Sequence, residues 1–231
     1  MIKPDTPVNH QPTLSRRRFI AGTSGLTFMI SMGDFLSDNL ASATENLERN
    51  KSRGANITVW VKINSEGMIT ILNPSAEMGQ GSMTALAVLI AEEMDADWSK
   101  VRVEQSPIDP KIYGRPGWGG RGYHMITVGS MTVRGYFMPL RQAGAKARYV
   151  LLKNAAMNWK VPLTELKTEP GMVIHRPTNR RMSYGEITSF AKTVKDIPEI
   201  PEMSLKRPEE FRLIGKFVPR IDIPEKVDGS A

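Results

Sequence analysis

Hydrophobic and polar residues alternate in two neighbouring runs that begin at residue 57. The first run, 57–63, is rich in β-branched side chains, and the second, 68–72, follows the turn residues 64–67. A period of two places successive side chains on opposite faces of a strand, so the two runs predict a β-hairpin. Further strands are expected at 101–104, 166–168 and 172–174.

Apolar side chains recur at a helical spacing in two longer stretches. One covers 82–96 and begins with a serine that can cap it, and the other covers 130–159, with a bend expected at Pro139. A shorter helix is expected over 183–195, where the opening serine and Glu186 form a capping box. These elements predict an α+β fold in which β-hairpins pack on two long helices.

The expected elements fall in one central part of the chain. Residues 56–195 are expected to form the α+β domain, and a polar linker, 44–55, precedes it. The proline-rich segment 196–231 is expected to be an extended linker to a continuation of the protein. Within the domain, glycines and prolines over 106–124 predict an irregular loop.

The first 43 residues carry three export signals in the order of a signal peptide. Arg16-Arg17 precede the apolar stretch 19–36, and Ala41-Ser42-Ala43 form a small-residue cleavage site. Asp34 argues against a permanent membrane span, which needs about 20 apolar residues. We therefore expect a twin-arginine signal peptide over 1–43 and a periplasmic location. The alternative is a chance basic cluster before an amphipathic helix.

The composition narrows the possible chemistry. The 31 basic and 24 acidic side chains give a net charge of +7. They form no dense basic run with interleaved aromatics, so no nucleic-acid partner is expected. The chain has no cysteine, which excludes disulfides, thiolate zinc sites, thiolate-held iron–sulfur clusters and covalently attached c-type haem in it. The spacing of residues shows no Ser/His/Asp set, metal cluster or carboxylate pair.

A glycine-rich loop joins the second expected strand to the first long helix. Glycines at 79 and 81 let the backbone approach a ligand, and free amides at a helix start can bind an anion. Gln80 adds an amide side chain with two donor hydrogens and an acceptor oxygen. This loop is a candidate phosphate cradle, and a plain connecting turn is the alternative.

A second glycine-rich loop, 117–124, precedes the longest expected helix. Gly129 and Ser130 repeat the arrangement of backbone amides and a hydroxyl at a helix start. Arg121 is a candidate partner for a phosphate, while His124 is expected to be structural or solvated. A surface loop without function is the alternative for this segment.

The chain resembles the N-terminal part of the large, molybdopterin-binding subunit of isoquinoline 1-oxidoreductase-like enzymes. These enzymes belong to the xanthine dehydrogenase and aldehyde oxidase superfamily, and a twin-arginine leader is usual in the group. The resemblance rests on motifs in the same order along the whole chain: Glu77-Met78-Gly79-Gln80-Gly81, Ile90-Ala91-Glu92-Glu93, Val128-Gly129-Ser130, 140–148, Ser183-Tyr184-Gly185-Glu186, 211–216 and 220–231.

The resemblance implies a molybdopterin dinucleotide that carries molybdenum. It implies that this cofactor is bordered by Gly79, Gln80, Gly81, Gly129 and Ser130, with no metal ligand among them. Members of the family usually have two glycines before that serine, and Val128 takes the place of the first. The glutamate that acts as general base lies in a later part of the family's proteins, so no catalytic residue is assigned here and the chain is expected to be inactive alone.

The resemblance also implies partners. These are a small subunit with two [2Fe-2S] clusters, the separate remainder of the large subunit, and a cytochrome as a later electron acceptor. Two hypotheses follow. The chain is the cofactor-binding portion of a molybdenum hydroxylase that oxidises N-heterocycles or aldehydes, or it is a non-enzymatic periplasmic binding or assembly module or a truncated gene remnant.

Overall fold

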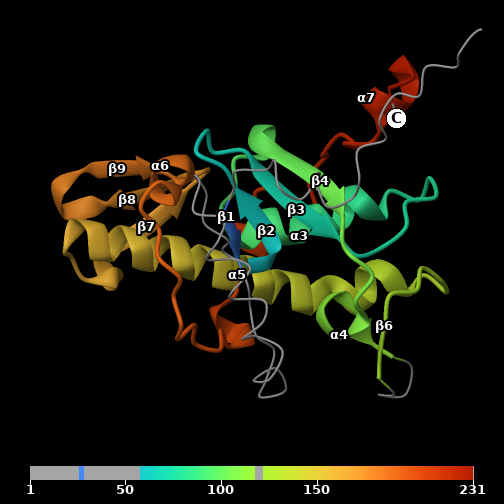
Figure 1. Cartoon of the computed structure of the whole chain (residues 1–231), viewed down its shortest axis with the longest axis horizontal. Helices are drawn as coiled ribbons and strands as arrows, with labels where there is room; N and C mark the ends of the chain where they lie inside the picture. The colour runs from blue at the N-terminus through green and yellow to red at the C-terminus, as the bar shows by residue number, and fades with distance from the viewer. Residues whose placement is uncertain (1–25, 29–57, 118–121, 231) are drawn as a thin grey trace, which may run out of the picture.

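Four strands form the first sheet of the molecule, in the order β1-β2-β3-β4 (Figure 1). The computed structural model describes residues 26–28, 58–117 and 122–230. The strands are β1 Leu26–Phe28, β2 Thr58–Ile63, β3 Ile69–Asn73 and β4 Val101–Gln105. The β2–β3 pair is antiparallel and β4 pairs parallel with β3. The first hairpin and the strand after it are therefore confirmed.

The edge strand β1 comes from the segment that we expect to be a signal peptide. It pairs antiparallel with β2. The arginine pair at 16–17 and the cleavage site at 41–43 lie outside the described residues. Cleavage after residue 43 would remove β1 and leave β2 as the edge of this sheet.

Two long helices pack against each other and against the sheet. Helix α3, Ser82–Glu93, crosses from β3 to β4, and helix α5, Met131–Trp159, continues through Pro139. Both helices are confirmed, although α3 ends before 96 because Asp95 takes a left-handed conformation (φ 52°). The expected serine cap is wrong, because Gly81 is the N-cap of α3 and no side chain caps it.

The α3–α5 contact depends on Gly144. A Cβ atom at this position would lie 2.5 Å from the backbone oxygen of Ile90 and 3.0 Å from the Cβ of Glu93. Only a glycine lets α5 approach the backbone of α3 this closely. The core beside this contact is built from large side chains that are almost fully buried: Ile63, Ile69, Ile71, Leu86, Ile90, Met94, Tyr136, Leu140, Leu151 and Tyr184.

A second, antiparallel sheet covers the C-terminal end of α5 (Figure 1). Its strands, in the order β7-β8-β9, are β7 Leu166–Glu169, β8 Met172–His175 and β9 Arg180–Ser183. The expected hairpin is confirmed, and β9 is an additional strand that lacks an alternating pattern. Helix α6, Tyr184–Thr188, opens with the expected capping box. It ends at Thr188 rather than at 195, and farther along the chain the backbone N–H of Lys192 donates to the side chain of Asn154.

The described parts of the glycine- and proline-rich stretch, 106–117 and 122–124, contain more regular structure than their composition indicates. Helix α4, Pro110–Tyr113, is capped by Asp109, and β5, Arg115–Pro116, pairs with β6, Tyr123–His124. The stretch is therefore not an irregular loop throughout. Short 3-10 turns complete the fold at Trp98–Lys100, Leu163–Glu165, Arg176–Thr178, Glu202–Ser204 and Pro208–Glu210.

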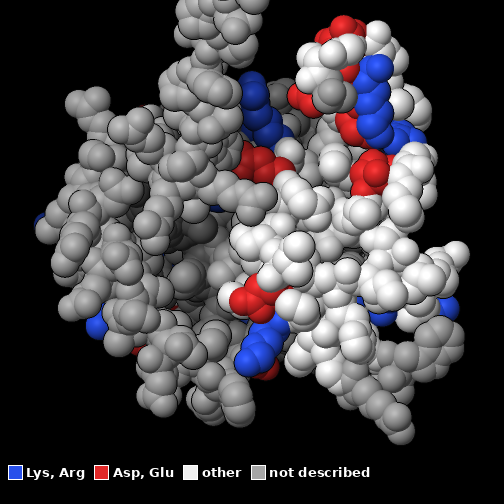
Figure 2. Space-filling model, turned by 45° about the vertical axis from the view of Figure 1, so that its right-hand side comes forward, with Lys and Arg blue, Asp and Glu red and all other residues white. Residues whose placement is uncertain are grey.

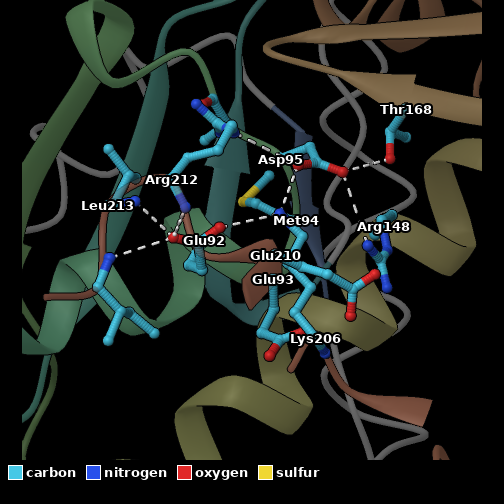
Figure 3. A network of polar contacts seen from close by, with 12 residues as sticks. Glu92, Glu93, Met94, Asp95, Arg148, Thr168, Lys206, Glu210, Arg212 and Leu213 are labelled. Atoms are coloured by element: carbon cyan, nitrogen blue, oxygen red, sulfur yellow. Dashed lines mark hydrogen bonds and ion pairs between the residues drawn. The ribbon is translucent and has the colours of Figure 1, made fainter. Parts of the chain in front are cut away.

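The proline-rich C-terminal segment folds back across the C-terminal end of α3. Glu92 of α3 is fully buried and accepts the backbone N–H groups of Arg212, Leu213 and Ile214 at 2.6–3.1 Å, together with Lys206 Nζ at 2.9 Å (Figure 3). From there the chain continues to α7, Ile223–Asp228, at the end of the molecule opposite the second sheet (Figure 1).

Candidate functional site

The first glycine-rich loop lies between β3 and α3, where the chain turns through two left-handed glycines. Gly79 and Gly81 have φ values of 102° and 82°, which L side chains rarely adopt. The backbone amides at this turn converge, as expected. They do not remain free, however, because a side chain of the same loop fills the cradle.

Glu77 is the anion held by this loop. Its carboxylate accepts the backbone N–H groups of Gly79 (2.8 Å), Gly81 (2.9 Å) and Met83 (2.9 Å), and its side chain is only 4% exposed. Burial acts to raise the pKa of Glu77, but the three hydrogen bonds and the charge of Arg220 outweigh it and hold the pKa below its ordinary value. The prediction of free amides at this loop is therefore wrong.

Arg220, from the C-terminal segment, holds the loop from outside. Its guanidinium donates to the Gly79 oxygen at 2.6 Å and contacts the Glu77 carboxylate at 3.3 Å. Asp222 orients it by accepting from Nε at 3.0 Å and Nη2 at 2.6 Å, and the Ile221 amide donates to the Thr84 hydroxyl. Hydrogen bonds from Arg220, then Lys226, hold the pKa of Asp222 far below its usual range.

Sequence reasoning did not assign a role to Arg220. The 220–222 run belongs to the closing motif of the resemblance, but Arg220 is separated from Glu77 by 143 residues. The unpaired carboxylate in the loop and the arginine in the motif were the available signals. Only the folded chain brings the two side chains together.

Gln80 shapes the loop through its own side chain. Its Nε2 donates to the Ala76 oxygen at 2.8 Å and to the Ser82 hydroxyl at 2.6 Å, and its Oε1 accepts the Met78 amide at 2.6 Å. Both ends of the amide group therefore bond within the loop. In this arrangement Gln80 maintains the loop conformation, and the two glycines present the open backbone.

The segment 125–130, which follows the glycine-rich stretch 117–124 and is called the second loop from here on, lies directly beside the first loop. The hydroxyl of Thr127 is 2.9 Å from the hydroxyl of Ser75 and accepts the backbone N–H of Ala76 at 3.1 Å. Two residues later, Gly129 and Ser130 are both left-handed (φ 61° and 53°) and exposed at the start of α5. The structure thus brings all five predicted residues to one side of the molecule, while Arg121 lies outside the described residues.

The glycine positions leave room for a bound group. A Cβ built on Gly79 meets no atom within 4 Å, and one built on Gly129 meets only the Met131 side chain at 3.9 Å. Ser130 caps α5 without a side-chain hydrogen bond. The backbone at Gly79 and Gly129 is therefore open on the surface, whereas the amides that hold Glu77 are already occupied.

Large apolar side chains surround the two loops. Met78, Ile126 and Val128 are 69%, 51% and 55% exposed. On the face drawn in Figure 2, acidic and basic side chains gather at the upper right, with smaller charged patches in the upper middle and below the centre and uncharged atoms between them. Val128, which replaces the glycine usual in the resembling family, thus faces outward in a surface suited to a covering segment or ligand.

The described residues offer little chemistry of their own. None of their His, Asp and Glu side chains cluster in threes that could hold a metal ion. Among their helices, none is both long and apolar enough to cross a membrane.

We expect Glu77→Gln to loosen the loop without disrupting its shape. Gln keeps one acceptor oxygen but loses the charge that strengthens the three N–H bonds and the contact with Arg220, at a cost of about 2 kcal/mol. Hydrogen exchange at the amides of Gly79, Gly81 and Met83 should accelerate. Exchange unchanged at these amides would contradict the role of the carboxylate. Glu66→Gln, at an exposed turn, is the matched control.

The model of the molybdopterin cofactor-binding domain family matches residues 38–212. The chain is 36% identical to the beta subunit of isoquinoline 1-oxidoreductase from Brevundimonas diminuta, over 94% of this chain and 31% of that protein.

Two further relatives are named for other substrates. A membrane-bound aldehyde dehydrogenase of Gluconacetobacter polyoxogenes, named for pyrroloquinoline quinone, is 35% identical over 96% of this chain and 27% of its own length. One nicotinate dehydrogenase subunit, from Pseudomonas putida, is 30% identical over 75% of this chain and 14% of its own length. The chain spans about a third or less of these relatives.

Proposed function

Because this chain belongs to the family of molybdopterin cofactor-binding domains, we propose that it forms one wall of the cofactor site in a molybdenum hydroxylase. The observation that carries the proposal is the contact through Thr127, which joins the loop of Gly79 and Gly81 to the loop of Gly129 and Ser130. Relatives named for isoquinoline, nicotinate and aldehyde support N-heterocycles or aldehydes as the substrate class.

In this proposal, the residues of the chain position the cofactor and do not transfer protons. A bound molybdenum cofactor would supply the two-electron oxidation, with water as the oxygen source. Gly79 and Gly129 provide backbone surface for close approach, and Glu77 with Arg220 holds the first loop rigid. Glu77 is unsuited to act as general base, because its carboxylate already accepts three amides and its pKa is lowered.

The proposal requires partners for electron transfer. The chain has no cysteine, so it cannot hold a thiolate-ligated cluster or a covalently attached haem that would pass electrons on. We therefore propose an assembly with a small [2Fe-2S] subunit, the remainder of the large subunit, and a cytochrome as later acceptor. The paired arginines at 16–17 support export by the twin-arginine route, so the assembly is proposed to act in the periplasm.

Affinity purification of the chain from its native cells tests this function. We expect molybdenum, pterin, an iron–sulfur subunit and the rest of the large subunit to co-purify from the periplasmic fraction. Recovery of the chain alone and metal-free, in cells that retain the related hydroxylase activity, would reject the enzyme and favour an assembly module or a gene remnant. Recovery only from the cytoplasm would contradict export.

A pair of glycine substitutions, one at Gly79 and a control at Gly215, extends this purification to the first loop. Gly79→Ala places a side chain on the open surface at φ 102° and should lower the molybdenum content of the assembly at least fivefold, by strain and steric exclusion. Gly215→Ala introduces a similar strain (φ 75°) at a position where the new Cβ meets no atom within 4 Å, and it should retain the molybdenum. Equal molybdenum content in the two variants would contradict a role for the first loop.

A further inference from the structure

Arg115 is a buried cation for which the described part of the chain supplies no anionic partner. The residue is 4% exposed, and no carboxylate oxygen of the described chain lies within 4 Å of its guanidinium. Among the described residues, its Nη1 and Nη2 reach the backbone oxygens of Pro116 and Ile126, both at 3.5 Å. Its Nε is buried without a hydrogen-bond partner in the described part of the protein. A buried charge in this state is costly, so its retention calls for an anion.

The position of Arg115 links this charge to the second loop. Its side chain packs across Gly135 of α5, where a Cβ would lie 2.5 Å from the Arg115 Cδ. The guanidinium extends to the oxygen of Ile126, three residues before Gly129. The charge therefore lies beneath the first turns of α5, whose N-terminus adds a partial positive charge of its own.

The two loops differ in how their charges are balanced. The first loop already contains its anion, because the Glu77 carboxylate fills the amide cradle and pairs with Arg220. Beside the second loop lies Arg115, for which the described residues supply no carboxylate, and Gly129 and Ser130 of this loop are exposed. An anionic group that binds at this surface would meet unbalanced positive charge only at the second loop.

We propose that Arg115 is the counter-charge for a phosphate or pyrophosphate group bound over Gly129 and Ser130. The inference rests on the proposed function, because a dinucleotide cofactor carries such a group. Arg115 does not touch the ligand. It acts as a positioning residue, through its charge and through its hold on the Ile126 backbone, and its low exposure limits screening by salt.

Calorimetric titration of the full chain with inorganic pyrophosphate tests the inference. Arg115→Met keeps the packing of the stem against Gly135 but removes the charge, and should weaken pyrophosphate binding about tenfold, or about 1.4 kcal/mol. Arg115→Lys retains the charge and should bind within about threefold of the wild type. Arg134→Met removes an exposed arginine from the first turns of α5 and should change the affinity less than twofold.

The melting temperature of the variants distinguishes a role of Arg115 in anion binding from a role in the stability of the fold. Arg115→Met should raise the melting temperature by a few degrees, because it removes a buried, unpaired charge. A lowered melting temperature with unchanged pyrophosphate affinity would overturn the inference, as would a wild-type chain that binds no pyrophosphate. The binding measurement needs no molybdenum, so it can separate this inference from the proposed function. An assembly that contains no metal but keeps Arg115-dependent pyrophosphate binding would reject the proposed function and leave the inference standing.

Discussion

Glu92→Ala should destabilise the protein by about 3–5 kcal/mol, the largest effect that we expect from a single substitution. The Glu92 side chain is fully buried, and three consecutive backbone amides and Lys206 Nζ donate to it. Its removal leaves the amides of Arg212, Leu213 and Ile214 without their acceptor. Urea unfolding followed by circular dichroism measures the loss.

The charge of Glu92 also makes stability depend on pH. Burial acts to raise its pKa, but hydrogen bonds from Leu213, Lys206 and Ile214 outweigh this and lower the pKa below 4.5. Its contribution is therefore present above about pH 4.5 and is lost as the pH falls through the lowered pKa. Glu92→Gln should be less stable at pH 7 and should lose less stability than the wild type on acidification.

Glu209→Ala provides the control for this prediction. Glu209 is an exposed acid of the same C-terminal segment, so its removal should change the free energy of unfolding by less than about 0.5 kcal/mol. A wild-type-like Glu92→Ala variant would show that the segment does not depend on this contact. The contact matters for the site, since the segment held by Glu92 continues to Arg220.

Gly144→Ala should destabilise the protein by about 2–3 kcal/mol. A glycine-to-alanine change inside a helix ordinarily stabilises it by about 0.5–1 kcal/mol. At this position the added Cβ would lie 2.5 Å from the Ile90 oxygen, so α3 and α5 must move apart and lose core packing. The atom that the new Cβ would contact is a backbone oxygen, which cannot rotate away as a side chain could. Thermal or urea unfolding shows directly whether the substitution lowers or raises the free energy of unfolding.

The exposed position Met157 on the same helix supplies the comparison. Met157→Ala changes a solvent-facing side chain and should alter the free energy of unfolding by less than about 0.5 kcal/mol. If Gly144→Ala were stabilising instead, the close approach of the two helices would not be a constraint on this fold.

Local patterns in the sequence were sufficient where the interacting residues are neighbours along the chain. The hairpin of β2 and β3 follows from alternation and a short turn, and the capping box of Ser183 and Glu186 links residues three apart. The glycines at 79, 81 and 129 likewise determined where the backbone turns, because a left-handed conformation is a local property of the residue.

Elements whose partners are distant were predicted less well. In strand β9, Arg180–Ser183, hydrophobic and polar residues do not alternate. The strand forms by pairing with the edge of β8. The helix expected over 183–195 ends at Thr188, and beyond it the amide of Lys192 donates to Asn154 on α5 instead of to a helical carbonyl. In both cases tertiary contacts replace the hydrogen bonds that local preference favours.

The sequence alone determined the two candidate loops, and only the tertiary structure decided their charge. The amides of the first loop are occupied because Glu77 turns inward and Arg220, 143 residues away, approaches it. The charge beneath the second loop comes from Arg115 on another strand, which packs against Gly135. Which donors face a ligand depends on the direction of side chains from distant segments, and that direction is set by packing rather than by spacing along the chain.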